Sequence, residues 1–206
     1  DKCIQCNKCS LVCPHAVIRP YLLDETEKAA APEGFRTIVA NGKAKQMGLH
    51  FALSISAYDC TGCGSCAQSC PANALEMQPA VLNEKDKELF NFGLTLAPKG
   101  DIFEPYSIKG SQFRQPLLEF SAACAGCGET PYAKLLTQLF GDRVFWANAT
   151  GCSQAWGSAM PGIPYTVNHR GFGPAWTNSL FENNAELCLG MYLSVKQQIG
   201  RASCRE

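Results

Sequence analysis

The stretch that decides the fold is residues 60–71, Cys60-Thr-Gly-Cys63-Gly-Ser-Cys66-Ala-Gln-Ser-Cys70-Pro71. The same arrangement opens the chain in residues 3–14, Cys3-Ile-Gln-Cys6-Asn-Lys-Cys9-Ser-Leu-Val-Cys13-Pro14. Both copies follow the pattern C-x2-C-x2-C-x3-C-P. Two cysteine-rich loops of identical spacing therefore frame the first part of the chain.

This spacing holds [4Fe–4S] clusters in bacterial-type proteins that carry two of them. Two residues between cysteines allow one tight loop to turn three thiolates toward a single cubane, whereas the fourth cysteine begins the next element and ligates the other cluster. The spacing therefore predicts crossed ligation. One cluster is expected on Cys3, Cys6, Cys9 and Cys70, and the other on Cys60, Cys63, Cys66 and Cys13.

Two other uses of the cysteines explain the pattern less well. Structural zinc sites usually take two separated C-x2-C pairs, but here three cysteines share each loop and a Cys-Pro pair follows twice. A disulfide framework is typical of small secreted chains, and nothing in the sequence resembles a signal peptide. Iron–sulfur ligation is therefore the preferred interpretation.

Composition limits the class of protein further. The 206 residues carry 18 basic and 18 acidic side chains, so no nucleic-acid footprint is visible. No run of apolar residues is long enough for a membrane span. Thirteen cysteines without a secretory signal indicate a reducing compartment, and we expect a cytoplasmic location.

The two ends of the chain carry separate expectations. Asp1 stands almost directly before the first predicted ligand, so we expect the chain to start within a longer protein. Residues 199–206 read IGRASCRE, which resembles a translated sequencing adapter. We expect this stretch, with Cys204, to be a non-native tail without function.

Residues 1–80 are predicted to form an α+β two-cluster ferredoxin-like domain with a hairpin insertion at 14–59. Residues 35–40 and 49–55 flank Asn41-Gly42, which is a hairpin turn signal. The insertion is either a shield over one cluster or an elaboration without function. Residues 74–77 are expected to mirror a strand at 16–21 and to complete a pseudo-twofold arrangement.

The remainder is predicted as a linker over 81–119, with a short helix near 83–92, and then an α/β domain over 120–198. A helix after Cys127 has Thr130 as expected N-cap and Gly141 as its end, and a strand follows at 144–147. Its apolar face is formed by Tyr132, Leu135, Leu136, Leu139 and Phe140. A second helix near 179–197 is expected to point Phe181, Ala185, Cys188, Leu189 and Tyr192 inward, with Cys188 as a buried core cysteine.

The cysteines of the second half leave two interpretations open. Cys124, Cys127 and Cys152 are either a redox dithiol with a core thiol or ligands of a third metal site whose fourth ligand is missing. The loops around these cysteines are rich in glycine (Gly126, Gly128 and Gly151), which would let backbone amides approach the sulfurs and favours a cluster. The histidines stand alone and are expected to be structural: His15, His50 and His169.

Three stretches resemble one enzyme family: FSAACAGCGETPYAKLLTQLFGD, ANATGCS and GPAWTNSLFENNAE. They are similar to pyruvate:ferredoxin (flavodoxin) oxidoreductases, in which a two-cluster ferredoxin-like domain leads into a thiamine-diphosphate-binding α/β domain. The resemblance covers residues 1–198 and implies that the last part is the N-terminal portion of that domain. It further implies that Cys124, Cys127 and Cys152 ligate a proximal [4Fe–4S] cluster, and that Glu129 and Cys152 lie at the thiamine cofactor.

The function that this resemblance implies is oxidative decarboxylation of a 2-oxoacid, pyruvate being favoured, to acyl-coenzyme A. Electrons would pass singly through the clusters to ferredoxin or flavodoxin, in a full-length protein that is a homodimer and holds thiamine diphosphate and Mg²⁺. The pyruvate and coenzyme A sites would lie outside this chain, which carries no assigned catalytic residue. The alternative is an eight-iron ferredoxin-type carrier fused to a structural α/β domain.

Overall fold

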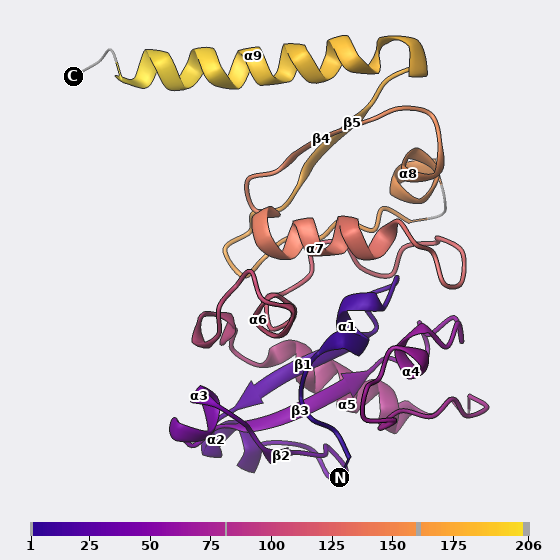
Figure 1. Cartoon of the computed structure of the whole chain (residues 1–206), viewed down its shortest axis with the longest axis vertical. Coiled ribbons are helices and arrows are strands. Elements are labelled where there is room, and N and C mark those ends of the chain that lie inside the picture. Colours follow the sequence, from indigo (N-terminus) through magenta and orange to yellow (C-terminus); the bar gives the residue numbers. More distant parts are fainter. Residues whose placement is uncertain (1, 81, 160–161, 204–206) are drawn as a thin grey trace.

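The computed structural model describes residues 2–80, 82–159 and 162–203 (Figure 1). The helices are α1 (Lys8–Val12), α2 (Glu25–Ala29), α3 (Lys43–Gln46), α4 (Ser65–Gln68), α5 (Glu84–Thr95), α6 (Ile108–Gln112), α7 (Thr130–Phe140), α8 (Cys152–Gln154) and α9 (Asn184–Ser203). The strands are β1 (Ile18–Leu23), β2 (Ile38–Val39), β3 (His50–Ile55), β4 (Phe145–Asn148) and β5 (Ala175–Asn178). Single helical turns lie at η1 (Gly100–Ile102), η2 (Ala155–Ala159) and η3 (Phe181–Asn183).

The two cysteine motifs share one backbone conformation. Positive φ angles recur at matching positions of the motifs: Gln5 (58°) with Gly62 (69°), Asn7 (62°) with Gly64 (76°), and Ala16 (56°) with Asn73 (46°). The short helices α1 and α4, which carry the third cysteine of each motif, contact one another. The repeat in the sequence is therefore a repeat in the backbone as well.

The first sheet is antiparallel with strand order β1-β3-β2. Strands β1 and β3 both lie in the insertion, and they pair from Ile18↔Ile55 to Leu23↔His50. Residues 74–77 form no strand, so the expectation that they mirror β1 is wrong. In place of a tight hairpin at Asn41-Gly42, the helical turn α3 joins β2 to β3.

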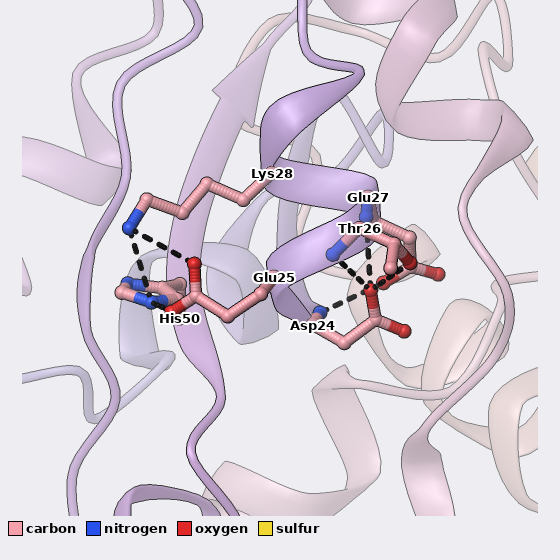
Figure 2. A network of polar contacts seen from close by, with 6 residues as sticks. All are labelled: Asp24, Glu25, Thr26, Glu27, Lys28 and His50. Atoms are coloured by element: carbon pink, nitrogen blue, oxygen red, sulfur yellow. Dashed lines mark hydrogen bonds and ion pairs between the residues drawn. The ribbon is translucent and has the colours of Figure 1, made fainter.

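Polar contacts at α2 hold parts of the insertion together. Asp24 caps α2 by accepting hydrogen bonds from the amides of Thr26 and Glu27, while the Glu27 carboxylate accepts one from the Asp24 amide (Figure 2). On the other side of the helix, Glu25 Oε1 lies 2.6 Å from His50 Nε2 at the start of β3 (Figure 2). His50 therefore has a structural role, as expected.

The stretch expected to be a linker packs against the first sheet and the first motif. Phe90 of α5 is buried, and Gly93 lies so close to Tyr21 that an added Cβ would come within 2.6 Å of the ring. Gln112 of α6 accepts a hydrogen bond from Ser10 Oγ at 3.0 Å. Buried apolar residues of the insertion and of the segment after α6 form one core cluster: Leu22, Ala40, Ala44, Leu49, Phe51 and Phe113.

Helix α7 buries its polar face, which reverses the expectation from its apolar periodicity. Tyr132 and Leu136 of the apolar face are 73% and 45% exposed. The side chains turned inward are Thr130, Ala133, Lys134, Thr137 and Gln138. They face polar backbone: Thr137 Oγ1 accepts from the Leu117 amide at 3.0 Å, and Gln138 Nε2 donates to the Arg114 carbonyl at 3.0 Å. Buried backbone groups need such partners.

The last part contains a parallel strand pair and a long helix. Strands β4 and β5 pair in register from Phe145↔Ala175 to Asn148↔Asn178, and the connection between them includes α8 and η2. Figure 1 shows α9 on the far side of this pair from α7. A parallel sheet normally has both faces covered.

The prediction of which residues of the second long helix point inward is wrong. That helix begins at Asn184, so Phe181 lies before it in η3 and is 76% exposed. Leu189 and Tyr192 are 57% and 60% exposed, and Ala185 and Cys188 are also exposed. The physical reason is that β4 and β5 are too small a surface to cover the helix.

Candidate metal centres

One cavity joins the first motif to the second. Its volume is about 390 Å³, and it lies beside the loop from Cys60 to Cys66 and the start of β1. Cysteines from both motifs line it: Cys13, Cys60, Cys63 and Cys66. These are the four residues that crossed ligation assigns to one cluster, so the donor set and the space between its members fit a [4Fe–4S] group.

The pKa values report the same grouping of sulfurs. Burial raises the pKa of Cys66, and the neighbouring Cys13, Cys60 and Cys63 add to that rise. Burial also raises the pKa of Cys9 to about 12, with further contributions from Cys3 and Cys6 of its own motif and from Cys66 of the other. Thiols that oppose one another's ionisation lie close together. Each loop thus gathers its own three cysteines, and Cys13 joins those of the other motif.

Backbone amides point at the sulfurs, as iron–sulfur sites require. The Gln5 amide lies 3.4 Å from Cys3 Sγ, and the Ala74 amide lies 3.3 Å from Cys70 Sγ. Hydrogen bonds led by that of Ala74 hold the pKa of Cys70 below its usual range. Alternating right- and left-handed residues create such concavities of N–H groups. The assignment of Cys70 to the first cluster stays a prediction.

A single metal ion would need a tighter arrangement than these sulfurs show. Zinc bound at about 2.3 Å from each thiolate draws its ligands close together. Within residues 2–80, 82–159 and 162–203, no three Cys, His, Asp or Glu side chains gather in that way. The sulfur-bearing residues Cys13, Cys60, Cys63 and Cys66 instead line a cavity of about 390 Å³, and they would hold a [4Fe–4S] group there.

The third cysteine loop repeats the turn of the first two and lies against the second. Gly126 occupies the same position between Cys124 and Cys127 as Gly62 does between Cys60 and Cys63, and its φ of 73° matches the 69° of Gly62. Its amide donates a hydrogen bond to the Cys63 sulfur. Burial alone would raise the pKa of Cys63, but hydrogen bonds from Ser65 and Gly126 lower it overall.

Cys152 opens α8 directly after β4, and a hydrogen bond connects its segment to the third loop. Trp156 of η2 donates through Nε1 to Glu129 Oε2 at 3.0 Å. Glu129 stands two residues after Cys127, so the contact holds Cys152 and Cys127 on neighbouring segments. Convergence of all three sulfurs on a third cluster stays a prediction.

Glu129 occupies the N-cap position of α7, so the prediction that Thr130 is the N-cap is wrong by one residue. Its carboxylate makes no capping hydrogen bond and accepts the one from Trp156 instead. Burial raises the pKa of the nearby Tyr165 to about 12, and the charge of Glu129 adds to this. An acid held at the edge of an aromatic cluster is available to a polar ligand.

Two further residues lie near the cysteines: His15, which the sequence predicts to be structural, and Lys134, which it does not single out. His15 is buried beside the cavity, with Nδ1 2.9 Å from the Ser121 carbonyl and no hydrogen-bond partner at Nε2 among the described residues. Lys134 reaches from α7 to the end of α1, and burial lowers its pKa to about 8. A lone lysine in an amphipathic helix is ordinarily expected to face solvent, so nothing in the sequence indicated that Lys134 is buried.

Comparison with known proteins agrees with this geometry. The 4Fe-4S dicluster domain family matches residues 2–74, which supports an iron–sulfur unit in the first part of the chain. The chain is 56% identical to the pyruvate-flavodoxin oxidoreductase of Enterobacter agglomerans, over 95% of this chain and 16% of that protein. It is also 56% identical to the pyruvate:ferredoxin oxidoreductase of Moorella thermoacetica, over 96% of this chain and 17% of the relative.

A third relative, pyruvate dehydrogenase [NADP(+)] of Cryptosporidium parvum, is 52% identical over 98% of the chain and 10% of its own length. The chain therefore matches one segment of proteins named pyruvate:ferredoxin and pyruvate-flavodoxin oxidoreductases, and the resemblance seen in the sequence is confirmed. It spans 16–17% of the length of the first relatives it matches. Among the described residues, no helix is long and apolar enough to cross a membrane.

Proposed function

We propose that this chain is the electron-transfer segment of a pyruvate oxidoreductase that delivers electrons to ferredoxin or flavodoxin. The names of its relatives and the dicluster domain support this role. The reaction would be oxidative decarboxylation of pyruvate to acetyl-coenzyme A by the full-length protein. A cytoplasmic location and a homodimeric full-length form are part of the proposal.

The observation that carries the proposal is the contact between Gly126 and Cys63. An added Cβ at Gly126 would come 3.6 Å from Cys63 Cβ, so the third cysteine loop touches the second. The second shares its cavity with Cys13 of the first motif. Three cysteine loops thus follow one another in space. This order supports a path from the third loop, through the cluster on Cys60, Cys63, Cys66 and Cys13, to the cluster on Cys3, Cys6, Cys9 and Cys70.

The insertion covers the outer end of this path. Gln5 of the first loop donates to the Val39 carbonyl at 2.8 Å and accepts from the Asn41 amide at 2.9 Å. Cys3 packs against the core cluster that contains Phe51. These contacts favour the shield interpretation, in which the insertion excludes water from one cluster and so affects its potential.

The cofactor of the organic step would be held only in part by this chain. Thiamine diphosphate with Mg²⁺, when bound to the full-length protein, supplies the chemistry that removes carbon dioxide from the 2-oxoacid. Glu129 and Cys152 are the residues that would face it here. Glu129 fits such a role because its carboxylate is exposed, borders an aromatic cluster and is oriented by Trp156. Pyruvate and coenzyme A would bind elsewhere in the full-length protein.

The experiment is anaerobic reconstitution of the 206-residue chain with iron and sulfide. We expect at least about eight irons per chain, since each set of four thiolates holds one cubane. Dithionite-reduced chain should then pass electrons to ferredoxin or flavodoxin. Zinc retained in place of clusters, or clusters that reduce neither carrier, would refute the proposal. If the chain passes electrons to a carrier but substitution of Glu129 has no effect on the full-length enzyme, the alternative of a fused ferredoxin-type carrier is favoured.

A further inference from the structure

Lys134 is a buried lysine that reaches across from α7 into the two-cluster unit. Its side chain is among the least exposed in the protein, at 1%. The Nζ group donates to the carbonyl oxygens of Ser10, of Leu11 at 3.2 Å and of Cys13 at 3.0 Å. These carbonyls belong to the last turn of α1 and the residue that follows it.

The three acceptors require the charged form of the side chain. An ammonium group has three N–H donors and no lone pair. A neutral amine would donate only two hydrogen bonds and would direct its lone pair at a carbonyl oxygen. Lys134 is therefore an ammonium ion at the carbonyl end of α1, where the helix dipole favours a cation.

No carboxylate balances this charge in the part of the chain that the structure describes. None of the ion pairs there includes Lys134, and the neighbouring Arg19 is also cationic and pairs with Glu119. A buried cation without a counter-ion costs several kcal/mol. Carbonyl dipoles offset part of this cost, and a negatively charged group close by would offset the rest.

The predicted ligands on either side of this ammonium belong to different clusters. Cys9 lies on α1, one residue before the Ser10 acceptor, and is predicted to bind with Cys3 and Cys6. Cys13 supplies an acceptor itself and lines the cavity with the second motif. One cation thus stands beside the polypeptide segment that joins the two clusters. A cubane bound by thiolates carries negative charge, and reduction adds to it.

Resting on the proposed electron-transfer function, we propose that Lys134 is a positioning residue whose buried charge raises the reduction potentials of both clusters. Its positive charge stabilises the added electron in an interior where charges are weakly screened. The cluster on Cys13 is affected more, because the ammonium contacts that residue directly. The C-terminal part therefore supplies both the third cysteine loop and, on the helix that follows it, the charge that favours electron flow toward the first two clusters.

The test is a potentiometric titration, followed by electron paramagnetic resonance, of the reconstituted 206-residue chain and its Lys134→Met variant. We expect the reduction potentials of both clusters to fall in the variant. For the cluster on Cys13, the ratio of reduced to oxidised form at a fixed potential should fall at least tenfold, which corresponds to about 59 mV for one electron. Lys134→Arg keeps the charge and should restore most of the potential. Lys134→Gln keeps a donor without the charge and should behave like Lys134→Met.

Thr137→Val is the matched control, because it removes a neutral hydrogen bond from the same buried face of α7. It should lower the melting temperature and leave both potentials unchanged. If Lys134→Met and Lys134→Gln lower only the melting temperature, as Thr137→Val does, the charge has no effect on the clusters and the inference fails. If Lys134→Met does not fold, Lys134→Gln decides the question in the same way. A wild-type chain that binds no clusters would overturn the proposed function and this inference together.

Discussion

Gly126 rests against Cys63, with its amide directed at the sulfur and space for a Cβ only 3.6 Å from Cys63 Cβ. The backbone there has a φ of 73°, which L-residues adopt at a cost of roughly 1–2 kcal/mol. The position therefore needs glycine for its conformation more than for its space. Two segments that are 63 positions apart in the sequence meet at this point.

Substitution of Gly126 by alanine should lower the free energy of unfolding by about 1–2 kcal/mol. It should also shift the potential of the cluster on Cys63, because the hydrogen bond from the amide is displaced. Gly128→Ala is the control, since no atom lies within 4 Å of its added Cβ and its φ is not in the left-handed region. Urea unfolding and a potentiometric titration measure the two effects. Equal results for both variants would contradict the role of Gly126.

Crossed ligation predicts a specific pattern of iron loss. Cys13→Ser and Cys60→Ser each remove one cluster, and because they affect the same one, their combination should lose no more iron than either alone. Cys13→Ser combined with Cys3→Ser should lose both clusters. Iron analysis after anaerobic reconstitution should give a loss of about four irons in the first pair and about eight in the second. The reverse pattern would show that each motif binds its own cluster.

The shared backbone conformation of the two cysteine loops could be predicted from their identical spacing, because that spacing constrains one short stretch of backbone in each copy. The same local logic failed for α7. Thr137 and Gln138 look like a solvated face in the sequence, yet they bind carbonyl and amide groups of residues 114 and 117, which no local pattern reveals. The strand partner of β1 was missed for a similar reason, because α2, β2 and α3 separate β1 from β3 in the sequence.

Helix α9 shows a different limit of prediction. Its apolar residues, such as Leu189 and Tyr192, have helical spacing, but among the described residues they are 57% and 60% exposed. Periodicity identifies an apolar face without identifying its partner.

Glu129→Gln tests the role proposed for the acid beside the third loop. The amide can still accept the Trp156 hydrogen bond, but it lacks the charge. Hydrogen bonds to charged groups contribute about 1.5–3 kcal/mol, so the variant of the full-length enzyme should lose roughly tenfold to a hundredfold in thiamine diphosphate affinity or turnover. Cluster content should be unchanged. Trp156→Phe removes the orienting donor and should give a smaller loss in the same direction; full activity in both variants would exclude Glu129 from the site.

The capping box at α2 predicts a pH dependence. Hydrogen bonds from Thr26 and Glu27 hold the pKa of Asp24 below its usual value. A lowered carboxyl pKa means that the folded state binds protons less readily than the unfolded state, so the stabilisation is present above the unfolded pKa and is lost as pH falls through the folded pKa. Hydrogen exchange of α2 amides should accelerate, relative to the intrinsic rate, in that acid range. Asp24→Asn keeps an acceptor without the titration, and a persistent acid response in it would exclude Asp24 as the cause.

Two helix glycines should respond to alanine in opposite directions. In α5, a Cβ at Gly93 would lie 2.6 Å from Cε2 and 3.0 Å from Cζ of Tyr21, on the ring that packs between this helix and β1. Overpacking of this kind typically costs 1–3 kcal/mol, which should outweigh the gain of up to about 1 kcal/mol in helix propensity. In α9, nothing lies within 4 Å of a Cβ at Gly190, so the propensity gain should appear alone. Chemical denaturation should therefore show a lower midpoint for Gly93→Ala and a higher midpoint for Gly190→Ala. If Gly93→Ala were as stable as the wild type, the ring of Tyr21 would have to move freely, and the tight packing of α5 on the first sheet would be refuted.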